Sequence, residues 1–279
     1  MGKLFCLIGN PVGHSLSPHM HNDAFSQLGM NHHYHAFKVE QEDLEAAVAG
    51  LKALGVAGFN VTIPHKVEIM KYLDKVDGEA KKIGAVNTVV LEDGQYIGYN
   101  TDGQGYLQSL LDITDTLQSK NVLVVGAGGA SRAIVTVLSS YGVASLTIAN
   151  RTIEKAIDLA KQCQDKTEIR TMTIHGAEEQ LNHFDLIINT TSVGMSPNIN
   201  ALPLSVEKIK EGTIVSDLIY NPLKTKFLLD GEAKGAIAHD GVGMFVGQGA
   251  LAFQKWTGIL PDRIRMKKLV IAQLEGKTC

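Results

Sequence analysis

NVLVVGAGGASRAIVTVLSSYGVASLTIANRT, residues 121–152, is the stretch that decides the fold. An apolar run leads directly into the glycine-rich turn GAGGAS, and a long amphipathic stretch and a second apolar run follow. Strand, glycine turn, helix and strand form the unit from which doubly wound parallel sheets are built. Glycines in such a turn let backbone N–H groups approach a pyrophosphate at the helix N-terminus. The turn therefore predicts a dinucleotide site at Gly126, Ala127, Gly128, Gly129, Ala130 and Ser131, although Ser131 stands where a third glycine or alanine is usual.

The end of the second strand indicates which dinucleotide binds. An NAD enzyme commonly has Asp or Glu there to hold the ribose 2′-hydroxyl, whereas this chain has Asn150, Arg151 and Thr152, with Lys155 one helical turn on. A guanidinium can bond phosphate oxygens bidentately, while a carboxylate would repel a 2′-phosphate. The alternative is that Arg151 and Lys155 are solvated surface charges. We expect NADP as the cofactor.

The residues before this unit predict a second α/β unit. Apolar runs with strand character alternate with amphipathic runs in a βαβαβ pattern, and a further helix follows. The sequence Asp93-Gly94 then favours a two-residue turn in a hairpin over residues 85–101, which adds an antiparallel element. The expected strands are 3–9, 34–39 and 58–64, and the expected helices are 17–29, 42–55 and 65–74.

The rest of the chain completes the predicted division into two domains. Residues 103–114 form an expected bridging helix, and further strands are expected at 185–191, 213–220 and 236–241. Two helical patterns, 244–258 and 261–276, end the chain, and we expect them to fold back on the first domain. The predicted fold is α/β, with a mainly parallel N-terminal domain of residues 1–103 plus 244–279 and a Rossmann-type domain of residues 104–243.

Composition restricts the possible partners. The 279 residues are 44% hydrophobic and 20% charged, with a formal net charge of −3. This is the profile of a globular protein without the positive charge that nucleic acid or an anionic membrane surface would require. No apolar run approaches the roughly 20 residues of a membrane span, and the N-terminus does not read as a signal peptide. We expect a cytoplasmic protein with no nucleic-acid or membrane partner.

Three further motifs follow first-domain strands, where ligands bind in open α/β sheets. They are SLSP (15–18), NVTIPHK (60–66) and the pair AVNTV (85–89) and YNTDG (99–103). Together with GAGGAS, NRT, NTTSVGM (189–195) and GQGALAF (247–253), they resemble the shikimate dehydrogenase family over essentially the whole chain. The resemblance implies a reversible, NADP-dependent interconversion of 3-dehydroshikimate and shikimate in aromatic amino-acid biosynthesis. It also implies a small-molecule substrate in a cleft between the domains, and it favours a monomer over a dimer.

The resemblance also implies roles for single residues. Lys66 and Asp102 match the family's catalytic pair, in which a lysine transfers the proton and a carboxylate orients that lysine. Ser15 and Ser17 match the carboxylate anchors, because two short hydroxyls can donate to the two oxygens of one carboxylate. Asn60, Thr62, Asn87, Asp102, Tyr220 and Gln248 complete the implied substrate shell, and Thr190, Ser192, Met195, Leu218 and Gly241 match positions at the nicotinamide.

Other interpretations remain open at this point. Among dehydrogenases, the alternative is a quinate/shikimate dehydrogenase of broader substrate range that uses NAD. Outside the enzymes, the alternative is a catalytically silent NADP-binding protein. The stretch GHSLS, residues 13–17, lacks the second glycine of a nucleophile elbow, and Pro18 follows at once. The histidines between residues 14 and 65 show no completed ligand motif, so we expect no bound metal.

Overall fold

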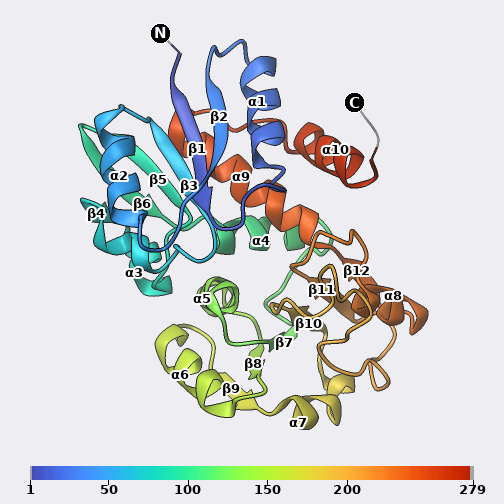
Figure 1. Cartoon of the computed structure of the whole chain (residues 1–279). Helices are drawn as coiled ribbons and strands as arrows, with labels where there is room; N and C mark the ends of the chain where they lie inside the picture. Colours follow the sequence, from blue (N-terminus) through green and yellow to red (C-terminus); the bar gives the residue numbers. More distant parts are fainter. Residues whose placement is uncertain (1, 277–279) are drawn as a thin grey trace. The chain divides into compact units, whose positions relative to one another are not determined.

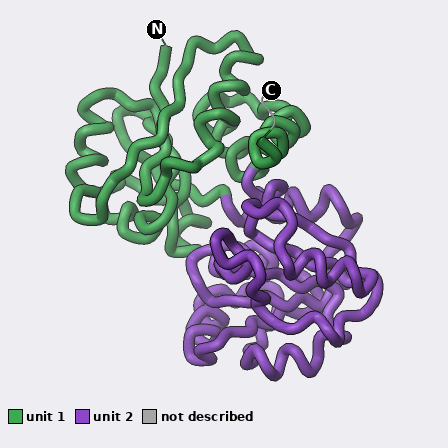
Figure 2. Tube along the Cα trace, turned by 45° about the vertical axis from the view of Figure 1, so that its right-hand side comes forward, with its two compact units in different colours: residues 1–101, 246–279 green, residues 102–245 purple. Residues whose placement is uncertain are grey.

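The computed structural model describes residues 2–276, which form two compact units with a six-stranded sheet in each (Figure 1). Unit 1 contains residues 1–101 and 246–279, and unit 2 contains residues 102–245 (Figure 2). Each unit has its own cluster of buried apolar side chains. Within residues 2–276, no helix combines the length and the apolar character that crossing a membrane requires.

The sheet of unit 1 is mixed, as the sequence predicts. Its order is β2-β1-β3-β5-β6-β4, with β1 parallel to β2 and β3 and with β5 antiparallel to both β3 and β6. The hairpin turn has positive φ at both Asp93 (48°) and Gly94 (75°), which matches the right-handed twist of the strands. The strands are β1 (Leu4–Gly9), β2 (His33–Lys38), β3 (Gly58–Val61), β4 (Lys75–Val76), β5 (Thr88–Glu92) and β6 (Gln95–Tyr99).

Helices cover both faces of this sheet. Cys6 packs in an apolar cluster with α2 (Leu44–Ala53), whereas its neighbour Phe5 contacts the rings of Phe25 and Trp256 at centroid distances of 5.3 and 5.0 Å. Successive strand residues point to opposite faces, so β1 is buried on both sides. The first face carries α2 and the second carries α1 (Ser17–Gln27) and residues 246–257 of α9 (Gly241–Thr257).

The C-terminal helices return to unit 1, as expected. Trp256 of α9 donates its indole N–H to the carbonyl oxygen of Val89 on β5 (3.0 Å). This approach requires a glycine beneath it, since a Cβ at Gly58 would lie 2.4 Å from the indole nitrogen. In α10 (Arg263–Leu274), Arg265 forms a bidentate ion pair with Asp23 of α1 at 2.7 and 2.8 Å.

The helix expected over residues 65–74 is wrong. Only a short 3-10 helix, Glu68–Lys71, forms there, followed by β4 and by α3 (Gly78–Ile83), which the sequence analysis does not predict. The backbone oxygen of Lys66 accepts a hydrogen bond from the chain just before β5 (2.8 Å), and the Asp74 carboxylate accepts one from the backbone of β6 (2.7 Å). These ties to the sheet at both ends outweigh the local helical pattern.

Unit 2 is the predicted doubly wound domain. Its strands run parallel in the order β12-β11-β10-β7-β8-β9, so the winding direction reverses between β7 and β10. The sequence prediction has no ranges for α6, β9, α7 and α8. The elements are α4 (Asp102–Leu111), β7 (Asn121–Val125), α5 (Gly129–Tyr141), β8 (Ser145–Ala149), α6 (Ile153–Cys163), β9 (Ile169–Met172), α7 (Ile174–Glu178), a 3-10 helix (Leu181–His183), β10 (Leu186–Asn189), β11 (Ile214–Asp217), α8 (Lys226–Ala233) and β12 (Ile237–His239).

A buried histidine lies among the aromatic side chains of unit 1. His21 of α1 is fully buried, and its ring stacks on Tyr34 at 4.5 Å and lies 5.2 Å from Trp256. Among residues 2–276, neither of its ring nitrogens has a hydrogen-bond partner. Burial lowers the pKa of His21 from 6.5 to about 3, so the folded protein holds this ring neutral.

This histidine makes stability sensitive to mild acid. The unfolded chain protonates His21 below pH 6.5 while the folded chain does not, so its contribution is intact above pH 6.5 and declines as the pH falls toward 3. We expect wild type to lose about 2 kcal/mol more unfolding free energy than His21→Phe between pH 8 and pH 5. Urea denaturation of both proteins at the two pH values measures this difference, and equal losses would show that His21 titrates normally in the folded state.

Candidate NADP and substrate sites

The glycine turn of unit 2 is fixed by contacts with Thr190 and Ser131. Gly126 has φ +110°, and a Cβ there would lie 2.7 Å from the hydroxyl of Thr190, so no larger residue fits. The buried Ser131 donates its hydroxyl to the carbonyl oxygen of Gly126 (2.8 Å). This bond explains the serine at the place of the usual third glycine: its side chain braces the turn and does not face a ligand.

The N-terminus of α5 is open. Gly128, which has no side chain, occupies the N-cap, and a Cβ at Gly128 or Gly129 would meet no atom of the described chain within 4 Å. The first N–H groups of a helix have no partners inside the helix, and the helix dipole adds positive potential there. An anion can therefore approach the backbone of this turn directly.

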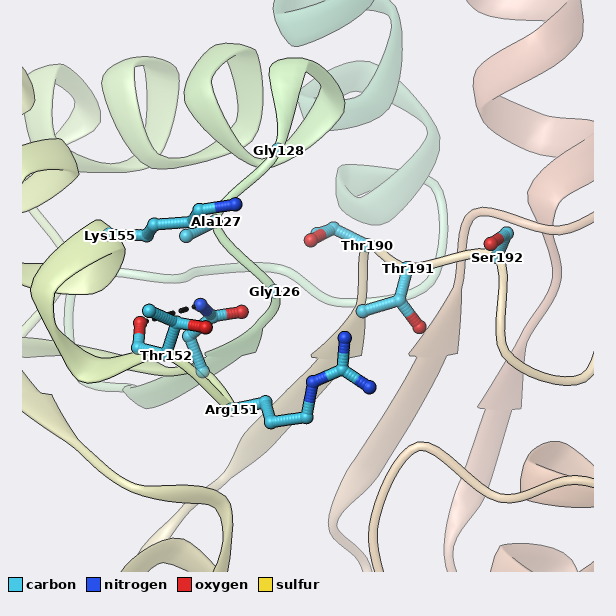
Figure 3. A pocket seen from close by; sticks show the side chains of 10 residues that line it. Gly126, Ala127, Gly128, Arg151, Thr152, Lys155, Thr190, Thr191 and Ser192 are labelled. Carbon is cyan, nitrogen blue, oxygen red and sulfur yellow. Dashed lines mark hydrogen bonds between the residues drawn. The ribbon is translucent and has the colours of Figure 1, made fainter.

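A cavity of about 370 Å³ lies beside the turn (Figure 3). It is formed where the carboxyl ends of β7, β8 and β10 meet, at the point where the winding of the sheet reverses. All of its lining residues except Thr191 are cofactor-binding residues predicted from the sequence. They are Gly126, Ala127, Gly128, Asn150, Arg151, Thr152, Lys155, Thr190, Thr191 and Ser192.

The charge in this cavity is positive. Figure 3 shows Arg151 extending from the end of β8 toward Thr191, while Lys155 lies beside Ala127. Asn150 donates its amide to the backbone oxygen of Thr152 (2.7 Å), which shapes the loop that carries Arg151. None of the described lining residues carries a carboxylate. The glycine turn, the open helix end and the two cations thus fit a phosphorylated dinucleotide.

A buried carboxylate joins the two neighbouring loops of unit 2. Asp217, at the end of β11, accepts hydrogen bonds from the side chains of Asn189 (3.1 Å) and Thr225 (2.8 Å) and from the backbone N–H of Ile219 (3.0 Å). Burial raises the pKa of Asp217, and these hydrogen bonds oppose the rise. Through Asp217, the network connects the loop after β10, which contains Thr191, to the loop that follows β11.

Four residues assigned to the nicotinamide or substrate follow strands of unit 2 but do not line the cavity. Leu218 is half-buried, and a Cβ at Gly241 would lie 2.3 Å from its carbonyl oxygen, so α9 can begin there only with glycine. The ring of Tyr220 packs on Phe245 at 4.8 Å, and burial raises its pKa. Met195 is exposed, and Gly129 and Ala130 are also outside the cavity lining.

Unit 1 places the two predicted serines in one turn between β1 and α1. The backbone N–H of Ser15 donates to the carbonyl of Val12 (3.0 Å), and the hydroxyl of Ser15 accepts from the backbone N–H of Ser17 (3.3 Å). Ser15 is half-buried, and Ser17 is buried as the first residue of α1. The second serine thus stands at a helix N-terminus, which favours an anion such as a carboxylate.

The side-chain amide of Asn60 forms three hydrogen bonds inside unit 1. Its amide nitrogen donates to the backbone oxygen of Asn87 and to the hydroxyl of Thr88, both at 3.1 Å. Its amide oxygen accepts from the hydroxyl of Tyr34 at 2.8 Å. Both N–H groups are therefore used inside the protein, and one lone pair of the oxygen is left for a ligand. This refines the sequence expectation, since Asn60 can accept from a substrate hydroxyl but has no donor to offer.

Asn87 connects the remaining polar residues of unit 1. Its amide oxygen accepts from the backbone N–H of Thr101 (2.8 Å), and its amide nitrogen donates to the hydroxyl of Thr101 (3.0 Å) and to Gln248 on α9 (3.4 Å). The structure thus brings Asn60, Asn87 and Gln248 into one network. Tyr34, Thr88 and Thr101 belong to it as well and are not among the predicted residues, although Thr88 and Thr101 lie within quoted motifs.

The predicted catalytic pair and Thr62 lie at the ends of secondary-structure elements. Thr62 and Lys66 are half-buried in the segment directly after β3. Asp102 is buried as the first residue of α4, which assigns it to unit 2. Within residues 2–276, no group of three potential His, Cys, Asp or Glu ligands gathers to hold a metal ion.

Comparison with protein families gives three matches. Residues 7–89 match the shikimate dehydrogenase substrate binding domain, and residues 108–211 match shikimate/quinate 5-dehydrogenase. Residues 241–271 match the shikimate 5′-dehydrogenase C-terminal domain. The matches follow the order of the two units, with the C-terminal match beginning at the first residue of α9.

Individual relatives agree with these matches. A shikimate dehydrogenase (NADP(+)) of Bacillus cereus is 53% identical over 277 residues, which is 99% of this chain and 100% of that protein. Shikimate 5-dehydrogenase from Thermus thermophilus, solved with NADP(H) and shikimate, has a TM-score of 0.88 at 37% identity, covering 96% of this chain and 98% of that one. Quinate dehydrogenase from Corynebacterium glutamicum, solved with NAD, has a TM-score of 0.91 at 28% identity, covering 98% and 100%. This chain belongs to the shikimate dehydrogenase family.

Proposed function

We propose that this chain catalyses the reversible, NADP-dependent interconversion of 3-dehydroshikimate and shikimate in aromatic amino-acid biosynthesis. The observation that carries the proposal is the cavity of unit 2, in which a glycine turn, an open helix N-terminus and Arg151 converge and which no carboxylate among the described residues lines. The family membership and the full-length identity to an NADP(+)-dependent relative support the same reaction. When bound, NADPH supplies the hydride for the reduction.

Residues of both units have separate roles in this proposal. Unit 2 binds the cofactor: Gly126 to Gly128 carry the pyrophosphate, and Arg151 and Lys155 bind the 2′-phosphate. Unit 1 binds the substrate: Ser15 and Ser17 donate to its carboxylate, and the Asn60–Asn87 network meets its ring hydroxyls.

Lys66 and Asp102 serve the proton transfer in this proposal. Reduction of a carbonyl leaves an alkoxide that must gain a proton, and oxidation requires the hydroxyl to lose one. The ammonium of Lys66 donates this proton in one direction, and the amine accepts it in the other. The carboxylate of Asp102 is the orienting group for this lysine in the proposal.

A spectrophotometric assay tests the proposed function. The purified chain is supplied with shikimate or quinate, each paired with NADP or NAD, while the absorbance of the reduced nicotinamide is followed. We expect turnover largely confined to shikimate with NADP. Comparable rates with quinate or NAD would instead assign the chain to a broader quinate/shikimate activity, and no turnover in any pair together with normal NADP binding would indicate a non-catalytic protein.

Exchanging Arg151 for Asp tests the cofactor assignment. The variant replaces a cation that can bond a 2′-phosphate with a carboxylate that repels it and can bond a ribose 2′-hydroxyl. We expect the ratio of kcat/KM for NADP to that for NAD to fall by at least about tenfold, since a charged hydrogen bond contributes about 1.5–3 kcal/mol. Arg170→Asp on β9, an exposed arginine outside the cavity, is the matched control and leaves the ratio unchanged. An unchanged ratio in both variants would refute the assignment.

Truncation of Lys66 tests the proton transfer. We expect Lys66→Ala to lower kcat by about 10²- to 10⁴-fold with a smaller effect on KM, because the group acts on the transition state. Lys71→Ala, which removes an exposed lysine from the same segment, should keep the wild-type kcat. Steady-state kinetics with shikimate and NADP measure both, and a near-normal kcat in Lys66→Ala would remove this lysine from the mechanism.

A further inference from the structure

Tyr34 is a buried residue on an exposed edge strand. β2 forms one edge of the unit 1 sheet, and most of its side chains are exposed, yet Tyr34 is only 2% exposed. Burying a tyrosine side chain normally requires a partner for its hydroxyl. Here the hydroxyl donates to the amide oxygen of Asn60, which lies two strands away on β3, and it also forms a hydrogen bond with the side chain of Ser17.

Two consecutive residues of α1 fix the place of Tyr34. The side-chain amide of Asn22 accepts from the backbone N–H of Tyr34 (2.8 Å) and donates to its carbonyl (2.9 Å), so both backbone groups on this edge are satisfied. The ring of His21 stacks on the phenol at a centroid distance of 4.5 Å and an interplanar angle of 24°. The ring of Trp256 lies 5.9 Å away and restricts it further.

The direction of the Asn60 amide follows from its neighbours. The backbone oxygen of Asn87 can only accept, so the amide nitrogen of Asn60 faces it, and the amide oxygen consequently faces the hydroxyl of Tyr34. Without that hydroxyl, the buried oxygen would lose its partner, and the amide could rotate out of its fixed plane. A buried polar group without a partner is costly, so the network has a reason to rearrange.

We propose that Tyr34 is a positioning residue, held by His21 and Asn22, that fixes the Asn60 amide so that its remaining oxygen lone pair accepts a ring hydroxyl of the substrate. This inference rests on the proposed function, because it takes Asn60 as part of the substrate shell. It also assigns a role to His21 and Asn22. Neither the fold of unit 2 nor the proposed proton transfer requires these two residues.

The test is Tyr34→Phe, which removes one oxygen and keeps the ring in its stack. We expect KM for shikimate to rise about fivefold, consistent with the loss of one hydrogen bond, while kcat and the KM for NADP change by less than about twofold. The matched control is Tyr96→Phe in the same sheet, where a fully buried hydroxyl donates to the backbone oxygen of Val56 at 2.9 Å. This control loses a comparable hydrogen bond and should keep the wild-type KM.

A double-mutant cycle separates positioning from a general loss of stability. If Tyr34 acts through Asn60, then Tyr34→Phe has no further effect on KM in the Asn60→Ala background. Asn22→Ala, which keeps the phenol but releases its backbone, should raise KM in the same direction. An unchanged KM in Tyr34→Phe, or a rise that persists in the Asn60→Ala background, would overturn the inference while wild-type turnover still supports the proposed function. If wild type did not oxidise shikimate, the proposed function would fail, and this inference would fail with it.

Discussion

Parallel strands that are buried on both faces can display polar groups only at their ends, and this constraint determines where both proposed sites lie. In unit 2 the strands β7, β8 and β10 are almost entirely buried, and the residues directly after them, Gly126, Asn150 and Thr190, line the cavity. In unit 1 Asn60 stands near the end of β3, and the serine turn follows β1. The proposed site residues lie at these ends because the side chains in the middle of each sheet are buried in the core.

Satisfied buried hydrogen bonds are the second feature that gives these strand ends a defined shape. Asp217 accepts three hydrogen bonds and joins two loops of unit 2, and Ser131 braces the glycine turn from inside. In unit 1 the amide of Asn60 has both of its N–H groups and one lone pair engaged. Such networks favour one arrangement of the loops, since each group left without a partner would cost free energy.

Much of this fold and of the proposed sites is predictable from the sequence, because local patterns encode it. The glycine turn after an apolar strand, the Asp93-Gly94 hairpin and the cationic residues after β8 depend on neighbouring residues alone. The segment after β3 is not predictable in this way, since contacts with distant strands prevent the helix that its pattern favours. Tyr34 is missed for a similar reason: its partner on β3 is 26 residues away, and the strand order that brings the two together is a property of the whole unit.

We propose that the strand ends of unit 1 hold the substrate while those of unit 2 hold NADP. A crystal structure of the wild-type chain grown with shikimate and NADP⁺ tests it most directly. We expect the shikimate carboxylate on the hydroxyls of Ser15 and Ser17, a ring hydroxyl on the amide oxygen of Asn60, and the 2′-phosphate on Arg151. Shikimate bound away from the two serines, or a 2′-phosphate without contact to Arg151, would contradict it.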